Sequence, residues 1–152
     1  MAHTHMADDF DVVVRTGIYN RFVETGRAPE VRQLADALHA SERDVRGALK
    51  RLADGHIIAL QPTGEILMAD PFWAIPTAFH VEGGTRSWWA GCIWEALGIP
   101  ILIGADADIY TSCPDCGEAM LLQARNGALL PSQGTIHFTV PARHWWDDVV
   151  FT

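Results

Sequence analysis

Residues 88–98 read Trp-Trp-Ala-Gly-Cys-Ile-Trp-Glu-Ala-Leu-Gly, and this stretch holds the most reactive side chains of the sequence. If it is helical, Cys92 and Glu95 lie on one face, because residues three apart are neighbours on a helix surface. A cysteine thiol then stands beside a carboxyl group that can take its proton and deliver it elsewhere. The stretch is therefore the first candidate for a catalytic site.

Three tryptophans of the same stretch, Trp88, Trp89 and Trp94, would surround this pair with apolar surface. Dry surroundings raise the pKa of a carboxyl group and keep it protonatable near neutrality. The spacing leaves a second interpretation open, in which Cys92 is a small buried hydrophobe and Glu95 points to water.

The composition limits the function classes. The chain has 152 residues, a net charge of −8 and 49% hydrophobic residues, which suits one domain or two small domains that share a core. Up to Asp70 there are 8 basic and 11 acidic residues, and after it 3 and 8, so neither half is a general polyanion binder. No apolar run approaches the ~20 residues that span a bilayer, and the start lacks a signal-peptide pattern. The lack of such a run predicts no membrane partner. Three cysteines, two of them in a Cys-x-x-Cys, favour reduced thiols in the cytoplasm.

The first half is predicted to be helical and to end in a hairpin. Helices are expected over residues 11–25, 31–38 and from Ser41 to about Gly55, followed by a hairpin over residues 57–68. This order is typical of a winged-helix domain, here over residues 11–70. Residues 1–10 are expected to be a disordered start or a cloning scar.

A winged-helix domain often binds DNA, and the predicted third helix carries four cations. They are Arg43, Arg46, Lys50 and Arg51. Acidic residues between them dilute the positive field, and the wing over residues 61–65 has no Lys or Arg to reach a minor groove. We therefore favour a structural domain over a nucleic-acid partner.

The second half, residues 77–152, changes to a strand-rich pattern after a packed, aromatic linker over residues 71–76. Strands are expected over residues 77–82, 107–111, 120–124 and 135–140, with a helix around Cys92 that ends at Gly98, a helical turn at 144–148 and a strand from 149. The predicted class is α+β, with the winged-helix-like domain followed by a mixed β-sheet packed on helices.

Two further motifs have open interpretations. Cys113 and Cys116 form a knuckle turn of the kind found in zinc ribbons, but two thiolates are half of a tetrahedral site. A zinc ion would need further ligands, and a structural or metal-scavenging dithiol is the alternative. The run His-Trp-Trp-Asp-Asp at 144–148, which includes Trp146, is either a pocket wall or a surface turn.

Several stretches together resemble the organomercurial (alkylmercury) lyases. They are residues 79–82, 89–97, 101–103, 109–116 and 146–152. The helical first half is similar to the N-terminal winged-helix-like domain of that family. The specificity of the likeness rests mainly on the stretch around Cys92.

This resemblance implies cleavage of a carbon–mercury bond by protonolysis to a hydrocarbon and Hg(II). It implies that Cys92 is the nucleophile and mercury ligand and that Glu95, where the family usually has Asp, shuttles the proton. We expect Trp88, Trp89 and Trp146 to line the substrate pocket. The expected substrate is a small organomercurial delivered by a low-molecular-weight thiol, with Hg(II) as bound product and no required cofactor.

The family also has a second mercury-binding cysteine near the C-terminus, which by alignment is expected just beyond Thr152. The last residues look like the start of a strand, so we expect the natural chain to continue. Two alternatives stay open: a non-catalytic thiolate metal-binding or metal-sensing protein of the same fold, and a winged-helix transcriptional regulator.

Overall fold

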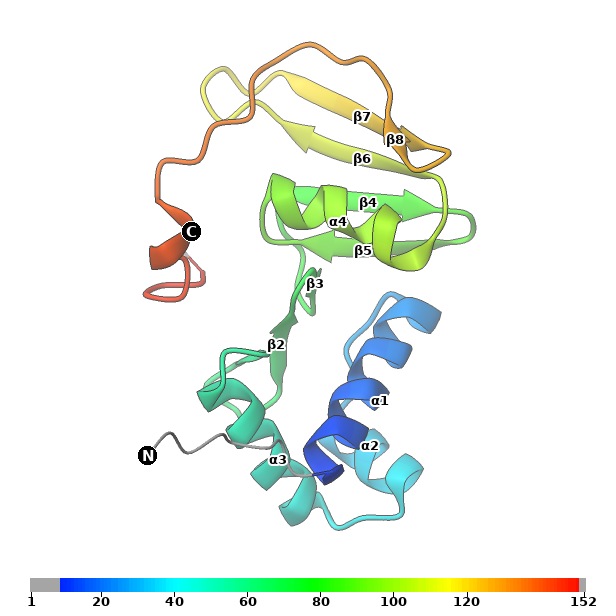
Figure 1. Cartoon of the computed structure of the whole chain (residues 1–152), viewed down its shortest axis with the longest axis vertical. Coiled ribbons are helices and arrows are strands. Elements are labelled where there is room, and N and C mark those ends of the chain that lie inside the picture. Colours follow the sequence, from blue (N-terminus) through cyan, green and yellow to red (C-terminus); the bar gives the residue numbers. More distant parts are fainter. Residues whose placement is uncertain (1–8, 151–152) are drawn as a thin grey trace.

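The computed structural model describes residues 9–150, and within them four α-helices accompany one eight-stranded sheet. The strand order is β1-β2-β3-β5-β4-β6-β7-β8, and every neighbouring pair is antiparallel. Helices α1–α3 gather at one end of the molecule, and α4 lies against the sheet at the other (Figure 1). The predicted α+β class is confirmed.

The helical end contains α1 (Asp9–Thr25), α2 (Val31–Leu38) and α3 (Glu42–Asp54). These bounds agree with the sequence prediction, except that α1 begins two residues earlier. Ser41 caps α3, since its hydroxyl oxygen accepts the amide of Asp44 at 3.1 Å.

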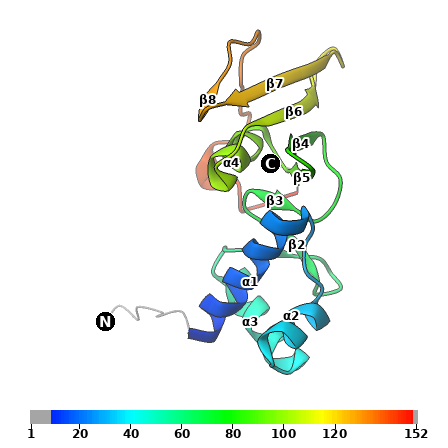
Figure 2. The ribbon, with the colours of Figure 1, turned by 90° about the vertical axis from the view of Figure 1, so that its right-hand side faces the viewer.

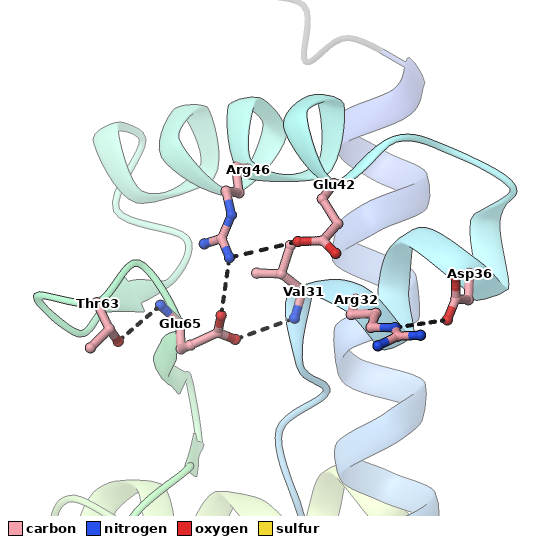
Figure 3. Close-up of polar contacts among 7 residues, drawn as sticks. All are labelled: Val31, Arg32, Asp36, Glu42, Arg46, Thr63 and Glu65. Carbon is pink, nitrogen blue, oxygen red and sulfur yellow. Dashed lines mark hydrogen bonds and ion pairs between the residues drawn. The ribbon is translucent and has the colours of Figure 1, made fainter.

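A hairpin follows, formed by β1 (Ala59–Leu60) and β2 (Ile66–Ala69). Its loop is bound to the helices through Glu65, which accepts the amide of Val31 at 3.2 Å and pairs with Arg46 at 3.5 Å (Figure 3). Arg46 also lies 3.9 Å from Glu42. The element order is the one predicted, and the winged-helix class stays a prediction.

The remaining elements run along the sheet. They are β3 (Phe72–Trp73), β4 (Phe79–Gly83), β5 (Arg86–Ala90), α4 (Ile93–Ile103), β6 (Ala107–Ser112), β7 (Ala119–Arg125), β8 (Ala128–Leu129) and the 3-10 turn η1 (Ala142–His144).

The prediction of a mixed sheet is wrong. Strands β5 and β6, which α4 connects, both pair with β4 on its opposite edges and are antiparallel to it. Strands β5 and β6 thus run in the same direction, but β4 lies between them, so they do not form a parallel pair. All hydrogen-bonded strand pairs of the described sheet are antiparallel.

The helix around Cys92 also differs from the prediction at both ends. Trp88 and Trp89 belong to β5, and the helix starts only at Ile93. It continues past Gly98, because Ile99 and Pro100 are buried in the core, and it ends at Gly104, whose φ of 62° suits a left-handed C-cap.

Three segments differ from the structure expected for them. Residues 71–76 are packed as expected, but they include the short strand β3, which pairs with both β2 and β5. Residues 135–140 have no ladder partner and form no strand, although they alternate in hydrophobicity. Residues 149–150 form a turn, and the expected continuation at 151–152 lies outside the described residues.

The buried side chains form one cluster that includes both halves of the chain. Phe22 of α1 stacks on Phe72 of β3, with ring centroids 5.2 Å apart, and its carbonyl accepts the indole N–H of Trp88 at 2.7 Å. Figure 2 shows α1 rising towards β3 and β5 at this junction. No helix within residues 9–150 is long and apolar enough to cross a membrane.

Candidate active site

Cys92 and Glu95 are brought together by the first turn of α4. Cys92 is the N-cap of the helix and Glu95 its third residue, and the two form a capping box. The Cys92 side chain faces the amide of Glu95, and the amide of Cys92 donates to Oε2 of Glu95 at 3.1 Å. Cysteine thus occupies the place that Ser or Thr usually takes in this motif.

The carboxyl group of Glu95 lies in a cradle of N–H donors. Its Oε2 accepts the amide of Gly91 at 2.5 Å and the indole Nε1 of Trp73 at 3.0 Å, in addition to the amide of Cys92. A Cβ at position 91 would come within 2.4 Å of the Trp73 ring. Only glycine therefore lets the indole reach the carboxylate from β3.

Burial dominates the electrostatics of this pair. It raises the pKa of Glu95 from 4.5 to about 7, with a smaller contribution in the same direction from the charge of Asp70, while the three N–H donors oppose the rise. Burial likewise raises the pKa of the Cys92 thiol, against the lowering effect of the amides of Glu95 and Trp94. At neutral pH the carboxyl group is therefore able to both accept and release a proton.

A cavity of about 100 Å3 opens on this pair. Its lining includes Trp73, Trp94 and Asp70 from the sheet and helix side, and Trp145, Trp146 and Val149 from the C-terminal segment. The ring of Trp146 stacks on His56, with centroids 4.8 Å apart and an angle of 6° between the planes. This contact joins the C-terminal segment to the turn after α3.

A second cavity, of about 180 Å3, also reaches Cys92. It shares Gly91, Cys92 and Trp145 with the first and adds Phe79 and residues 137–140. Among the residues that line the two cavities, Cys92 provides the only thiol. A molecule bound here would thus meet one thiol in a largely aromatic enclosure, with the thioether of Met68 also in the lining.

The predicted pocket residues are only partly assembled. Trp146 lines the cavity beside Cys92 and Glu95. Trp88 and Trp89 belong to β5 and are not among the residues that line the two cavities at Cys92, so their place in a substrate pocket stays a prediction. Trp88 is 2% exposed in the core, and Trp89 packs on His80 with centroids 4.4 Å apart.

The sequence interpretation missed three contributors to the site. Trp73, Trp145 and Asp70 all line the first cavity. Trp73 lies in the segment predicted to be a linker, and Asp70 at the predicted domain boundary. Trp145 lies in the run at 144–148, which the sequence left open as a pocket wall or a surface turn. The aromatic content of residues 71–76 was the available signal for Trp73, but its partner on α4 could not be deduced from spacing.

The knuckle of Cys113 and Cys116 lies in the β6–β7 hairpin, apart from both cavities. Within residues 9–150 no group of three or more His, Cys, Asp or Glu side chains could hold a metal ion. The structure therefore gives no support for the zinc site considered from the sequence.

Comparisons with known proteins found one matching family and a similar solved structure. The family described as alkylmercury lyase matches residues 72–152. Among solved structures, the mercury-bound form of MerB2 is similar, with a TM-score of 0.67 and 25% sequence identity. The similarity covers 83% of this chain and 61% of that one, so the chain spans less than two thirds of the length of that relative. No curated protein matches the chain.

Proposed function

The chain belongs to the alkylmercury lyase family, and on that premise we propose that it cleaves the carbon–mercury bond of a small organomercurial by protonolysis. The observation that carries the proposal is the Cys92–Glu95 capping box, in which a carboxyl group with a pKa of about 7 adjoins a thiol. A soft thiolate binds mercury, and a carboxyl group titrating near neutrality can supply the proton that carbon needs.

In the first step, the substrate arrives as an adduct of an organomercury cation with a low-molecular-weight thiol. The Cys92 sulfur forms a bond to mercury, the thiol proton passes to the Glu95 carboxylate, and the carrier leaves as a thiolate. Such carriers are abundant in a reducing cytoplasm, where we place the protein.

In the second step, Glu95 returns the proton to the carbon bound to mercury. The electron pair of the carbon–mercury bond forms the new C–H bond, and the hydrocarbon departs. Hg(II) stays on the Cys92 thiolate, and the displaced carrier thiolate becomes its second ligand. The balance is one thiol and one adduct giving a hydrocarbon and a mercury dithiolate.

The cradle around Glu95 indicates which oxygen carries the proton. Oε2 already accepts three N–H donors, so protonation there would disrupt them. No described residue hydrogen-bonds to Oε1. We therefore assign the mobile proton to Oε1 and an anchoring role to Oε2.

The proposal is tested by incubating the protein with an organomercurial and excess thiol and measuring hydrocarbon release. The Cys92→Ala variant should release none above the background, whereas Cys116→Ala, which removes a thiol outside both cavities, should retain the wild-type rate. Equal rates for wild type and Cys92→Ala would refute the assignment. Stoichiometric mercury uptake without hydrocarbon would instead support the non-catalytic metal-binding alternative.

A further inference from the structure

The thiols of Cys113 and Cys116 converge in a tight turn at the tip of the β6–β7 hairpin. The amide of Cys113 donates to the carbonyl of Glu118 at 2.9 Å, and the amide of Gly117 donates to the carbonyl of Cys113 at 2.8 Å. Gly117 has a φ of 74°, which lets the chain turn back into β7. The backbone therefore closes a tight turn that brings positions 113 and 116 close together.

The two thiols lie next to each other in this turn, because the side chain of Cys116 is within hydrogen-bonding distance of the Cys113 sulfur. Both cysteines are free, Cys116 is exposed and Cys113 is half-buried, so a solute can reach the sulfurs. The pair is thus prepared to bind a cation.

The number of ligands selects the kind of cation. Zinc requires four ligands in a structural site, and within residues 9–150 no third side chain joins a metal-binding group. Soft cations prefer thiolate, and some of them, Hg(II) among them, accept two sulfur ligands. A two-thiol turn therefore suits a soft, two-coordinate cation better than zinc.

We propose that Cys113 and Cys116 form a second metal site, separate from Cys92, that binds Hg(II) as a dithiolate. Binding from a carrier is a ligand exchange: mercury bis-thiolate and two protein thiols give the protein dithiolate and two carrier thiols. No oxidation or reduction occurs. The choice of Hg(II) among soft cations rests on the proposed function, which would release it, but the site itself does not depend on cleavage.

Both sulfurs belong to one turn, so the second bond forms intramolecularly. Such chelation strengthens binding by about 10²–10⁴-fold over independent ligands. The effective concentration of the second thiol is on the order of millimolar, because the turn links it to the first. The site should therefore retain Hg(II) when a monothiol competes at a similar, millimolar concentration.

The test uses the Cys92→Ala protein, in which cleavage is not expected, kept reduced with a phosphine. It is loaded with Hg(II), dialysed against excess glutathione and assayed for mercury and for free thiols. We expect one retained Hg(II) per chain and loss of both remaining thiols from the thiol count. Adding Cys113→Ser or Cys116→Ser to this background should weaken retention by at least tenfold.

Unchanged retention in these serine variants, or no retention in Cys92→Ala itself, would overturn the proposal. In a parallel dialysis the protein is loaded with Zn(II). Retention of one equivalent of Zn(II) that Hg(II) does not displace would also overturn the proposal. Because Cys92 is absent throughout, these outcomes do not depend on whether the protein cleaves organomercurials.

Discussion

Trp73 Nε1 lies 3.0 Å from Oε2 of Glu95, although the two residues are 22 positions apart and belong to β3 and α4. Burial stabilises the neutral form of the carboxyl group, and the amides of Gly91 and Cys92 together with the indole N–H of Trp73 stabilise the charged form. Trp73 is thus one of the donors that hold the pKa of Glu95 down to about 7, the value on which the proposed proton delivery depends.

Cleavage in a preformed Cys92–mercury adduct should slow as the pH rises through about 7, because only protonated Glu95 can supply the proton. The Trp73→Phe variant keeps an aromatic ring but removes the donor, so the pKa of Glu95 should rise further. We expect the decline in single-turnover rate to move upward by about one pH unit, equivalent to about 1.4 kcal/mol.

The matched control is Trp88→Phe, which removes an indole N–H that donates to the carbonyl of Phe22 rather than to Glu95. It should lower the free energy of unfolding by about 1–2 kcal/mol and leave the pH dependence of cleavage in place. A pH profile that moves equally in both variants would contradict the specific role of Trp73.

The Gly91→Ala variant should be destabilised by about 1–3 kcal/mol, because its Cβ would overlap the Trp73 ring. It should also lose cleavage activity, since the ring and the Gly91 amide both contact Glu95. Gly98→Ala is the control: a Cβ there meets only Pro71 at 3.9 Å, and alanine favours the helix by up to about 1 kcal/mol. Urea unfolding of both variants measures the difference.

The raised pKa of Glu95 also predicts how stability depends on pH. The folded state binds the proton more tightly than the unfolded chain, so the free energy of unfolding should fall as the pH rises from about 4.5 to about 7. Glu95→Gln removes this titration and still offers an oxygen to the N–H donors. At pH 8 it should be more stable than wild type by about 1–3 kcal/mol, yet inactive. Parallel pH–stability curves for the two proteins would show that Glu95 is not the titrating group.

The stack of Trp146 on His56 should hold the C-terminal segment over the cavity. Stacked rings contribute about 0.5–1.5 kcal/mol, so His56→Ala should raise KM by about 2- to 10-fold with a smaller effect on kcat. His39→Ala, at an exposed position after α2, is the control for removing an imidazole. An unchanged KM in His56→Ala would show that the stack does not affect substrate binding.

Local patterns in the sequence predicted helices α1–α3 and strands β4, β6 and β7 well. Ser41 identified the start of α3, and the hydrophobic spacing of residues 31–38 identified α2, because capping and helix periodicity depend on near neighbours. The proximity of Cys92 and Glu95 was predictable for the same reason.

The rest of the site depends on long-range pairing. Strand β3 has two residues and no periodicity, so neither its existence nor the contact of Trp73 with Glu95 could be deduced. Trp88 and Trp89 directly precede the helix, and only their pairing with β4 shows that they belong to a strand. Hydrophobic alternation predicted a strand over residues 135–140, but no strand forms there, because a strand also requires a neighbouring strand to pair with.

The position of β3 between β2 and β5 has a consequence for how the protein unfolds. The family match begins at Phe72, but the ring of Phe72 packs on Phe22, so a fragment starting there would expose this surface and loosen the strand that supports Glu95. The helices and the sheet should consequently melt in one cooperative transition rather than as separate modules. Glu95 is then held in place only while the whole molecule is folded. Activity and helicity should therefore be lost at the same denaturant concentration.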